Sequence, residues 1–344
     1  MQQIENTLYV MTHNAYIHLE NEAVRVDVDH KERLRVPLHH LGSVVTFGNI
    51  MISPALMHRC AEDGISMVLL NGYGRFKARL EGPVSGNILL RIAQHQHCRE
   101  EGFCLEIART LVAGKVKNSR QILLRGAREA SNEEDGEIIS KGAVGLMESL
   151  RSLPKATTME EVLGIEGHAA RSYFATLSRL VRQDIRGFFT MNGRTRRPPQ
   201  DAMNALLSFH YSLLMNDVRS ALETVGLDPQ LGFLHTVRPG RASLALDLME
   251  EFRPYLADRA ALTLINRGQV RPDDFEARTG GAVLLNEQGR KTVVGAYQER
   301  KQEEITHPLL TTRTRIGLLP FLQARLLART IRGDVEAYAP FLVR

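Results

Sequence analysis

The stretch Gly232-Phe-Leu-His-Thr-Val-Arg-Pro-Gly-Arg-Ala-Ser-Leu-Ala-Leu-Asp-Leu-Met-Glu-Glu-Phe-Arg-Pro254 decides both the fold and the chemistry expected of this chain. Its second half is mostly apolar, which predicts a largely buried helix with only a narrow polar strip. On such a helix Asp247 lies beside Glu250 and Glu251, because residues three and four apart share a face. Buried carboxylates need a cation or a proton nearby, and His235 precedes them. Imidazole and carboxylate bind divalent metals that support phosphoryl chemistry, so the stretch predicts a metal site on a helical scaffold.

Each of these residues also has a purely structural interpretation. The carboxylates alone are equally typical of a solvated helix face paired with Arg241 and Arg253. A single histidine on an apolar segment is more often a packed core residue. Glu166 is the third candidate ligand, expected near the start of a helix beside small residues such as Gly167, which permit close approach. A glutamate in a first helical turn also suits the helix dipole without any other role.

The composition is that of an ordinary globular protein, with 43% hydrophobic and 24% charged residues. At 344 residues the chain is long enough for two domains. Cys60, Cys98 and Cys104 form no CxxC pair, which disfavours a zinc site or a disulfide framework and favours a reducing compartment. The N-terminus shows no signal-peptide pattern, and no apolar run reaches about 18 residues. We therefore expect a cytoplasmic protein with no membrane span.

Hydropathy patterning changes near residue 85. Residues 1–84 contain short runs rich in Val, Ile, Leu and Tyr between turn residues, and one helix opened by Ser53-Pro54. From 85 to 344 apolar residues recur at steps of three and four, as in amphipathic helices, with a hairpin or irregular excursion near 282–285. The predicted class is α+β: a small N-terminal, mostly antiparallel β domain at 1–84, then a larger all-α catalytic domain at 85–344.

Capping signals place two of the helices. Thr158 and Glu161 have the spacing of a capping box, and a helix is expected over about 165–186. Asp201 is expected to cap the next helix, over about 202–225.

Basic residues gather in clusters, which predicts an anionic track such as DNA presents. The candidate DNA-binding residues are Arg75, Arg79, Lys115, Arg120, Arg194, Arg196, Arg197, Arg238 and Arg241, with Tyr211 for base stacking because the chain has no tryptophan. The net charge of +5 is compatible with a polyanionic partner, and dispersed solubilising charge is the alternative. The chain has no P-loop, GxGxxG fingerprint or nucleophile elbow, which disfavours the enzyme classes built on those motifs.

Four motifs occur in the order found in one known family. They are Ile165-Glu-Gly-x-Ala-Ala-x-x-Tyr-Phe174, Pro198-Pro-x-Asp-x-x-Asn-Ala-Leu-Leu-Ser-Phe-x-Tyr211, Gly232-Phe-Leu-His235 and Asp247-Leu-Met-Glu-Glu-Phe-Arg-Pro254. Over essentially its whole length the chain resembles the CRISPR-associated integrase, the larger subunit of the spacer-acquisition machinery, and most of all its type I-C variant. Ala202 and Met203 depart from the pattern, where the family often has proline and valine.

The resemblance implies both a site and partners. Glu166, His235 and Glu250 correspond to the family's metal-binding residues, which hold Mg²⁺ or Mn²⁺, and Asp247 matches a nearby acid that is also important. The implied reaction joins the 3′-hydroxyl ends of new spacer DNA to the CRISPR repeat by transesterification. The implied partners are double-stranded DNA (prespacer and repeat), a second copy of the chain bound through the β domain, and a small ferredoxin-like CRISPR-associated subunit.

Several alternatives stay open at this point. The same site would serve a general metal-dependent DNA or RNA nuclease acting on branched or single-stranded substrates. A non-catalytic DNA-binding scaffold, with its carboxylates merely paired to arginines, is a third interpretation. His235 is either a metal ligand or a general base, and whether Asp247 or Glu251 shares the metal stays open. We expect Glu251 to be a charge partner for an arginine.

Overall fold

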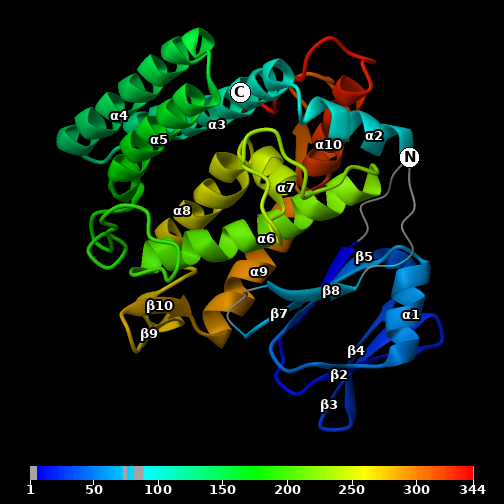
Figure 1. The fold of residues 1–344 in the computed structure, drawn as a ribbon. Coiled ribbons are helices and arrows are strands. Elements are labelled where there is room, and N and C mark those ends of the chain that lie inside the picture. Colours follow the sequence, from blue (N-terminus) through cyan, green and yellow to red (C-terminus); the bar gives the residue numbers. More distant parts are fainter. Residues whose placement is uncertain (1–5, 73–75, 81, 83–87, 344) are drawn as a thin grey trace. The chain divides into compact units, whose positions relative to one another are not determined.

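The computed structural model describes residues 6–72, 76–80, 82 and 88–343 (Figure 1). The chain forms two compact units, Met1–Ser85 with Asn286–Gln302, and Gly86–Leu285 with Glu303–Arg344. The first unit is rich in strands and the second is mostly helical, which confirms the α+β class. Helix α9 (Glu287–Gln302) falls in the first unit, whereas the sequence analysis placed all of 85–344 in the second domain.

Two four-stranded sheets build the first unit. One has the order β1-β5-β7-β8 and the other the order β4-β3-β2-β6. The strands are β1 (Asn6–Val10), β2 (Tyr16–Glu20), β3 (Ala23–Val28), β4 (Lys31–Pro37), β5 (Leu41–Phe47), β6 (Met51–Ile52), β7 (Ser66–Leu70) and β8 (Phe76–Leu80). Apolar residues of both sheets and of α1 (Pro54–Glu62) share one core, which includes Ile17, Val44 and Leu56.

The prediction of mostly antiparallel strands is wrong for the first sheet. Both β1 and β7 run parallel to β5, and β8 is antiparallel to β7. The physical reason is α1, which connects β5 to β7 and returns the chain in the same direction, as a helical crossover does. Ser53 caps this helix as predicted, because its Oγ accepts a hydrogen bond from the backbone N–H of Leu56 at 3.2 Å.

The second unit is built mainly from helices. They are α2 (Ile88–His97), α3 (Glu101–Arg128), α4 (Glu133–Ser152), α5 (Met159–Leu177), α6 (Ala202–Thr224), α7 (Ser243–Met249), the π-helical turn η4 (Arg253–Asp258), α8 (Arg259–Asn266) and α10 (Leu319–Ile331). Helices α3, α4 and α5 pack side by side (Figure 1). Asp201 caps α6 as predicted, accepting from the backbone N–H of Asn204.

Besides its helices, this unit contains short antiparallel strand pairs. Strands β9 (Phe275–Arg278) and β10 (Ala282–Leu285) form one pair, at the hairpin suggested by the sequence. Its turn uses Gly280 and Gly281, both with positive φ, a conformation that glycine adopts without steric cost. Strands β11 (Glu304–Thr306) and β12 (Arg313–Arg315) form the other pair, which is too short to give a sequence signal.

Helix α5 begins earlier than predicted. The capping box of Thr158 and Glu161 is formed, and the helix starts directly after it and runs through Gly164 to Leu177. The predicted range of about 165–186 is therefore wrong, because a single glycine does not end a helix that already has a strong cap. Glu166 consequently lies in the interior of α5, where the helix dipole no longer accounts for a carboxylate.

No helix in the described ranges is long and apolar enough to cross a membrane.

Candidate active site

Asp247 organises the loop that carries His235. Its side chain is fully buried on α7 and accepts hydrogen bonds from the backbone N–H groups of Phe233 (2.6 Å), Leu234 (2.9 Å) and His235 (2.9 Å). Nδ1 of His235 lies 2.6 Å from Asp247 Oδ1. Since a carboxylate only accepts, the imidazole hydrogen sits on Nδ1, which leaves the Nε2 lone pair for another partner.

Gly232 makes this arrangement possible. A Cβ at this position would lie 2.6 Å from Asp247 Oδ2 and 2.8 Å from the backbone carbon of Ser243. Only a residue without a side chain lets the loop approach α7 closely enough for its amides to reach the carboxylate.

Glu250 ends α7 and is the most strongly held carboxylate of the site. Its side chain is 3% exposed, Arg253 Nη1 lies 3.0 Å from Oε1, and His235 Nε2 lies 3.9 Å from the same oxygen. Lys115 Nζ, on α3, lies 2.8 Å from Oε2. Burial raises the pKa of Glu250, but the positive charges of Arg253 and Lys115 outweigh it and lower the pKa to about 2. Glu250 is therefore a buried, ionised carboxylate, and the solvated-face interpretation of this cluster is wrong.

Lys115 joins Glu250 to Glu166. The ammonium donates a short hydrogen bond to Oε1 of Glu166, so it stands between the two carboxylates. Burial lowers the pKa of Lys115, but Glu250 and Glu166 more than compensate and raise it, so the amine stays charged. Three elements distant in sequence, α3, α5 and α7, thus bring two carboxylates around one cation.

The donor chemistry of this cluster suits a hard divalent cation. Two carboxylates and an imidazole nitrogen are ligands that Mg²⁺ and Mn²⁺ accept, and a cation already neutralises the carboxylates. Glu250 Oε2 is buried, and within the described residues no donor meets it in good hydrogen-bond geometry, although Lys115 Nζ is close. In that same part of the chain, no three His, Cys, Asp or Glu side chains already converge as a metal cluster. Lys115 is the group that keeps Glu166 apart from the other two.

Glu251 faces away from this cluster. Its carboxyl accepts hydrogen bonds from Tyr338 OH (2.8 Å), Gln323 Nε2 (3.1 Å) and the backbone N–H of Phe341 (2.8 Å). Burial raises its pKa to about 8, although these three donors partly oppose the shift. The prediction that Glu251 pairs with an arginine is therefore wrong. It anchors the C-terminal segment against α7 instead.

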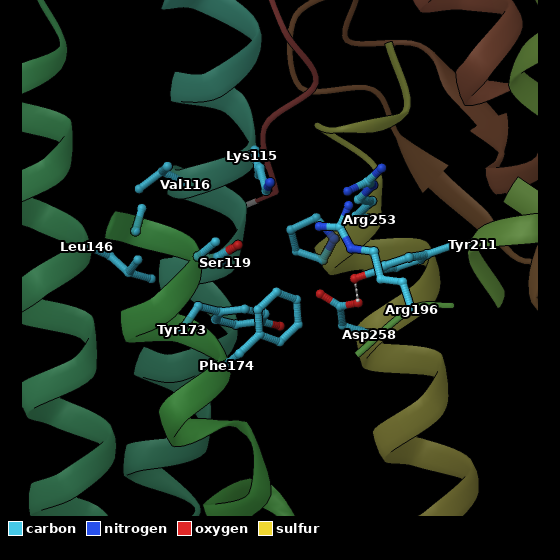
Figure 2. Close-up of a pocket in the computed structure, with 13 residues that line it drawn as sticks. Lys115, Val116, Ser119, Leu146, Tyr173, Phe174, Arg196, Tyr211, Arg253 and Asp258 are labelled. Carbon is cyan, nitrogen blue, oxygen red and sulfur yellow. Dashed lines mark hydrogen bonds between the residues drawn. The ribbon is translucent and has the colours of Figure 1, made fainter. Parts of the chain in front are cut away.

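A small cavity lies next to Lys115 and Arg253 (Figure 2). Its volume of about 20 Å³ is enough for about one water molecule. At one wall Tyr211 donates to Asp258 Oδ1 at 2.7 Å (Figure 2), and the Arg253 guanidinium lies 4.9 Å from the centre of the Tyr211 ring. Burial raises the pKa of Asp258 to about 6, against the hydroxyls of Tyr211 and Tyr173. This wall holds Arg253 in place for its ion pair with Glu250.

Sequence reasoning missed the parts played by Arg253 and Asp258. Arg253 had been considered only as a partner in a solvated ion pair. Asp258 is an acid within the mostly apolar run Tyr255-Leu-Ala-Asp-Arg-Ala-Ala-Leu262, and that isolation was the available signal. An acid placed among buried positions needs a partner, and here the partner is Tyr211.

Residues 8–299 match the family model described as CRISPR associated protein Cas1. The chain belongs to the Cas1 family. It is 52% identical to the CRISPR-associated endonuclease Cas1 1 of Moorella thermoacetica and 46% identical to the protein of the same name from Chlorobaculum tepidum, and both alignments cover 100% of both chains. The family predicted from the four motifs is thereby confirmed.

Solved structures share the Cas1 fold. A Cas1 protein from Thermotoga maritima superimposes with a TM-score of 0.82 at 22% identity, over 97% of this chain and 99% of that one. A casposase bound to its integration product gives a TM-score of 0.83 at 21% identity, over 97% and 92% of the two chains. At these identities the likeness concerns the fold alone.

Three of the predicted DNA contacts are only partly exposed in this Cas1-family structure and have protein partners. Lys115 is enclosed by Glu166 and Glu250. Arg194 donates to Asn204 Oδ1 (2.7 Å), and its guanidinium lies 5.2 Å from the centre of the Tyr211 ring. Tyr211 is bonded to an aspartate and covered by arginines, so it offers no open face for stacking. Within the described residues these three side chains are therefore engaged by protein partners, and their contact with DNA stays a prediction.

The remaining predicted contacts differ in exposure. Arg196 is exposed and borders the cavity of Figure 2, so it lies beside the candidate site. Arg197 and Arg238 are exposed as well. Arg79, Arg120 and Arg241 are partly exposed, and Arg75 lies outside the described residues.

Proposed function

We propose that this Cas1-family chain is a divalent-metal-dependent DNA endonuclease and integrase, which joins 3′-hydroxyl ends of new spacer DNA to a CRISPR repeat. The observation that carries the proposal is the buried, ionised Glu250: Lys115 joins it to Glu166, and His235 Nε2 lies 3.9 Å from its Oε1. The names of the relatives, CRISPR-associated endonucleases, support the reaction class.

In this proposal Glu166, His235 and Glu250 hold Mg²⁺ or Mn²⁺. A bound ion of this kind supplies Lewis-acid stabilisation of a reacting phosphate and favours ionisation of the attacking hydroxyl. Glu250 is ready as a ligand because its low pKa keeps it ionised at neutral pH. His235 is assigned as a ligand rather than a general base, because its Nε2 already faces Glu250.

Two further residues have supporting parts in the proposed site. Asp247 is not a ligand, since both its oxygens are occupied by the His235 loop, and it instead fixes the ring orientation. Arg253 and Lys115 neutralise the carboxylates and are suitably placed to face the negative charge of a phosphodiester.

The proposed partners follow the same family. We propose double-stranded DNA as substrate, a homodimer, and a small ferredoxin-like Cas2-type subunit, in the cytoplasm and in a type I-C system. Similar folds occur in structures described as a Cas6-RT-Cas1–Cas2 complex (TM-score 0.83, 24% identity, 100% of this chain and 36% of that one) and a partial form of it (TM-score 0.65, 26% identity, 98% and 99%). These descriptions support the partner proposal.

The test uses DNA with labelled 3′-hydroxyl ends and a repeat-containing plasmid, with Mn²⁺. We expect the wild-type protein to give joined products and Glu250→Gln to give none, at unchanged melting temperature within a few degrees. Glu148→Gln, an exposed glutamate on α4, is the matched control and should remain active. Shortened but never joined DNA would favour a general nuclease. Full joining by Glu250→Gln would overturn the assignment.

A further inference from the structure

A second basic surface lies away from the candidate site. It is a groove of about 520 Å³, lined by α3, by the segment 179–186 and by α8 with its C-terminal end. Its lining includes seven arginines against two carboxylates, Glu129 and Asp135. The seven arginines and two carboxylates give this lining a formal charge of +5, equal to the net charge of the whole chain.

The groove is held in shape by buried contacts. Asp135 is 2% exposed and accepts from Arg186 at 2.6 Å and from Arg179 at 3.1 Å. Asn266 ties the segment to α8, because its Oδ1 accepts from the backbone N–H of Arg182 (3.0 Å) and its Nδ2 donates to the Leu180 carbonyl (2.9 Å). The guanidiniums of Arg179 and Arg186 are therefore held in place by Asp135.

Glycine on α3 lets the opposite wall approach. A Cβ on Gly126 would lie 2.0 Å from Leu180 Cδ2, so a larger residue there would force the Leu180 side chain to move. The close packing places arginines of α3 and of the segment on facing walls of one groove.

Part of the positive charge is uncompensated. Arg128 and Arg267 are exposed, and within the described ranges neither has a carboxylate partner. Arg182 is also exposed and pairs only with the exposed Asp184, an ion pair of little energetic weight. Arginine forks held on opposite walls suit the spaced oxygens of a phosphodiester backbone better than one small anion.

The groove and the candidate site both include residues of α3. Lys115 and Arg125 lie on the same helix, ten residues apart, which corresponds to about 15 Å along its axis. Phosphates of one B-DNA strand are about 3.4 Å apart along the axis, so the interval covers roughly four nucleotides. We infer that this groove binds the DNA backbone about four nucleotides from the reacting phosphate. This inference rests on the proposed function, in which DNA is the substrate.

The test compares two variants of equal charge. One replaces the groove residues, Arg128→Gln, Arg182→Gln and Arg267→Gln. The other replaces exposed arginines that do not line the groove, Arg99→Gln, Arg325→Gln and Arg329→Gln. The full-length proteins are titrated onto a labelled branched duplex without metal at about 50–200 mM salt, and Kd is measured by fluorescence anisotropy.

We expect the groove variant to lower the slope of log Kd against log salt by about 2.7, since each lost phosphate contact removes about 0.9. Its Kd at about 100 mM salt should rise at least about tenfold, whereas the control variant keeps the wild-type slope. Equal losses in both variants would mean a net-charge effect and would overturn the inference. So would weaker binding of an acidic peptide with DNA binding unchanged.

The outcome is separable from that of the proposed function. Glu250→Gln should bind DNA with the wild-type salt slope while forming no joined product. If the wild-type protein forms no product, the proposed function fails, but the anisotropy slope still reports on the groove.

Discussion

Asp247→Asn tests how the active-site loop is built. The aspartate accepts four N–H groups, three from the backbone of 233–235 and one from the His235 ring, two on each oxygen. An asparagine has one acceptor oxygen, so two of the four donors would face an NH₂ group. Hydrogen bonds to a charged group contribute about 1.5–3 kcal/mol each, and the site is fully buried, so the expected loss is about 3–6 kcal/mol.

Both stability and activity should respond to this substitution. At roughly 2–4 °C per kcal/mol for a unit of this size, the melting temperature should fall by about 10 °C in differential scanning calorimetry. Strand joining below that temperature should fall about 10- to 100-fold, because the ring of His235 loses its orienting partner.

A matched control is Asp228→Asn. Asp228 Oδ1 accepts a single N–H, from Gln230 at 2.8 Å, in a partly exposed turn, so its loss should cost no more than about 1 kcal/mol. If Asp247→Asn unfolds within about 1 kcal/mol of the wild type, the hydrogen-bond account of the loop is refuted.

Three more perturbations follow from the same geometry. Because the pKa of Glu251 is raised to about 8, the folded state keeps a proton that the unfolded state has released above about pH 4.5. The free energy of unfolding should therefore decline from about pH 4.5 to about pH 8, by up to about 5 kcal/mol. Urea titrations of Glu251→Gln should lack this decline. Lys115→Met removes the cation that joins Glu166 and Glu250 and leaves only Arg253 to neutralise Glu250, so the melting temperature should fall, and Mn²⁺ should restore it more than it raises that of the wild type. Gly232→Ala forces a Cβ against Asp247, so calorimetry should show a loss of about 1–3 kcal/mol.

Each of these has a control and a contrary outcome. Lys117→Met removes an exposed lysine two residues away and should not change the Mn²⁺ response; equal responses would contradict the cation role of Lys115. Gly164→Ala meets no atom within 4 Å and should be neutral or slightly stabilising. Persistence of the pH-dependent decline in Glu251→Gln would assign it to another group, of which Asp258 is the first to examine.

Local signals in the sequence were sufficient to predict several helices of the second unit and the burial of its acidic residues. The caps at Thr158 and Asp201 work through contacts of three or four residues, so they could be identified from spacing alone. The apolar run around Asp247 likewise indicated that its acids are buried. The family motifs then connected Glu166 to a cluster that lies far from it in sequence.

The features that the sequence did not predict depend on tertiary contacts. Lys115 lies in a stretch rich in lysine and arginine that looks like a surface, and only the approach of α5 and α7 makes it a buried counter-ion. Glu250 and Glu251 are neighbours, but one faces the cations and the other faces the C-terminal segment, a difference set by the position of Tyr338. The parallel β5–β7 pairing depends on the direction in which α1 returns the chain.

The central claim is that Glu166, His235 and Glu250 hold one divalent cation, and Mn²⁺ binding followed by electron paramagnetic resonance tests it most directly. The account predicts one Mn²⁺ per wild-type chain, binding weakened at least about tenfold in Glu250→Gln, and wild-type binding in Glu251→Gln. Equal Mn²⁺ affinity in the wild-type protein and Glu250→Gln would contradict it.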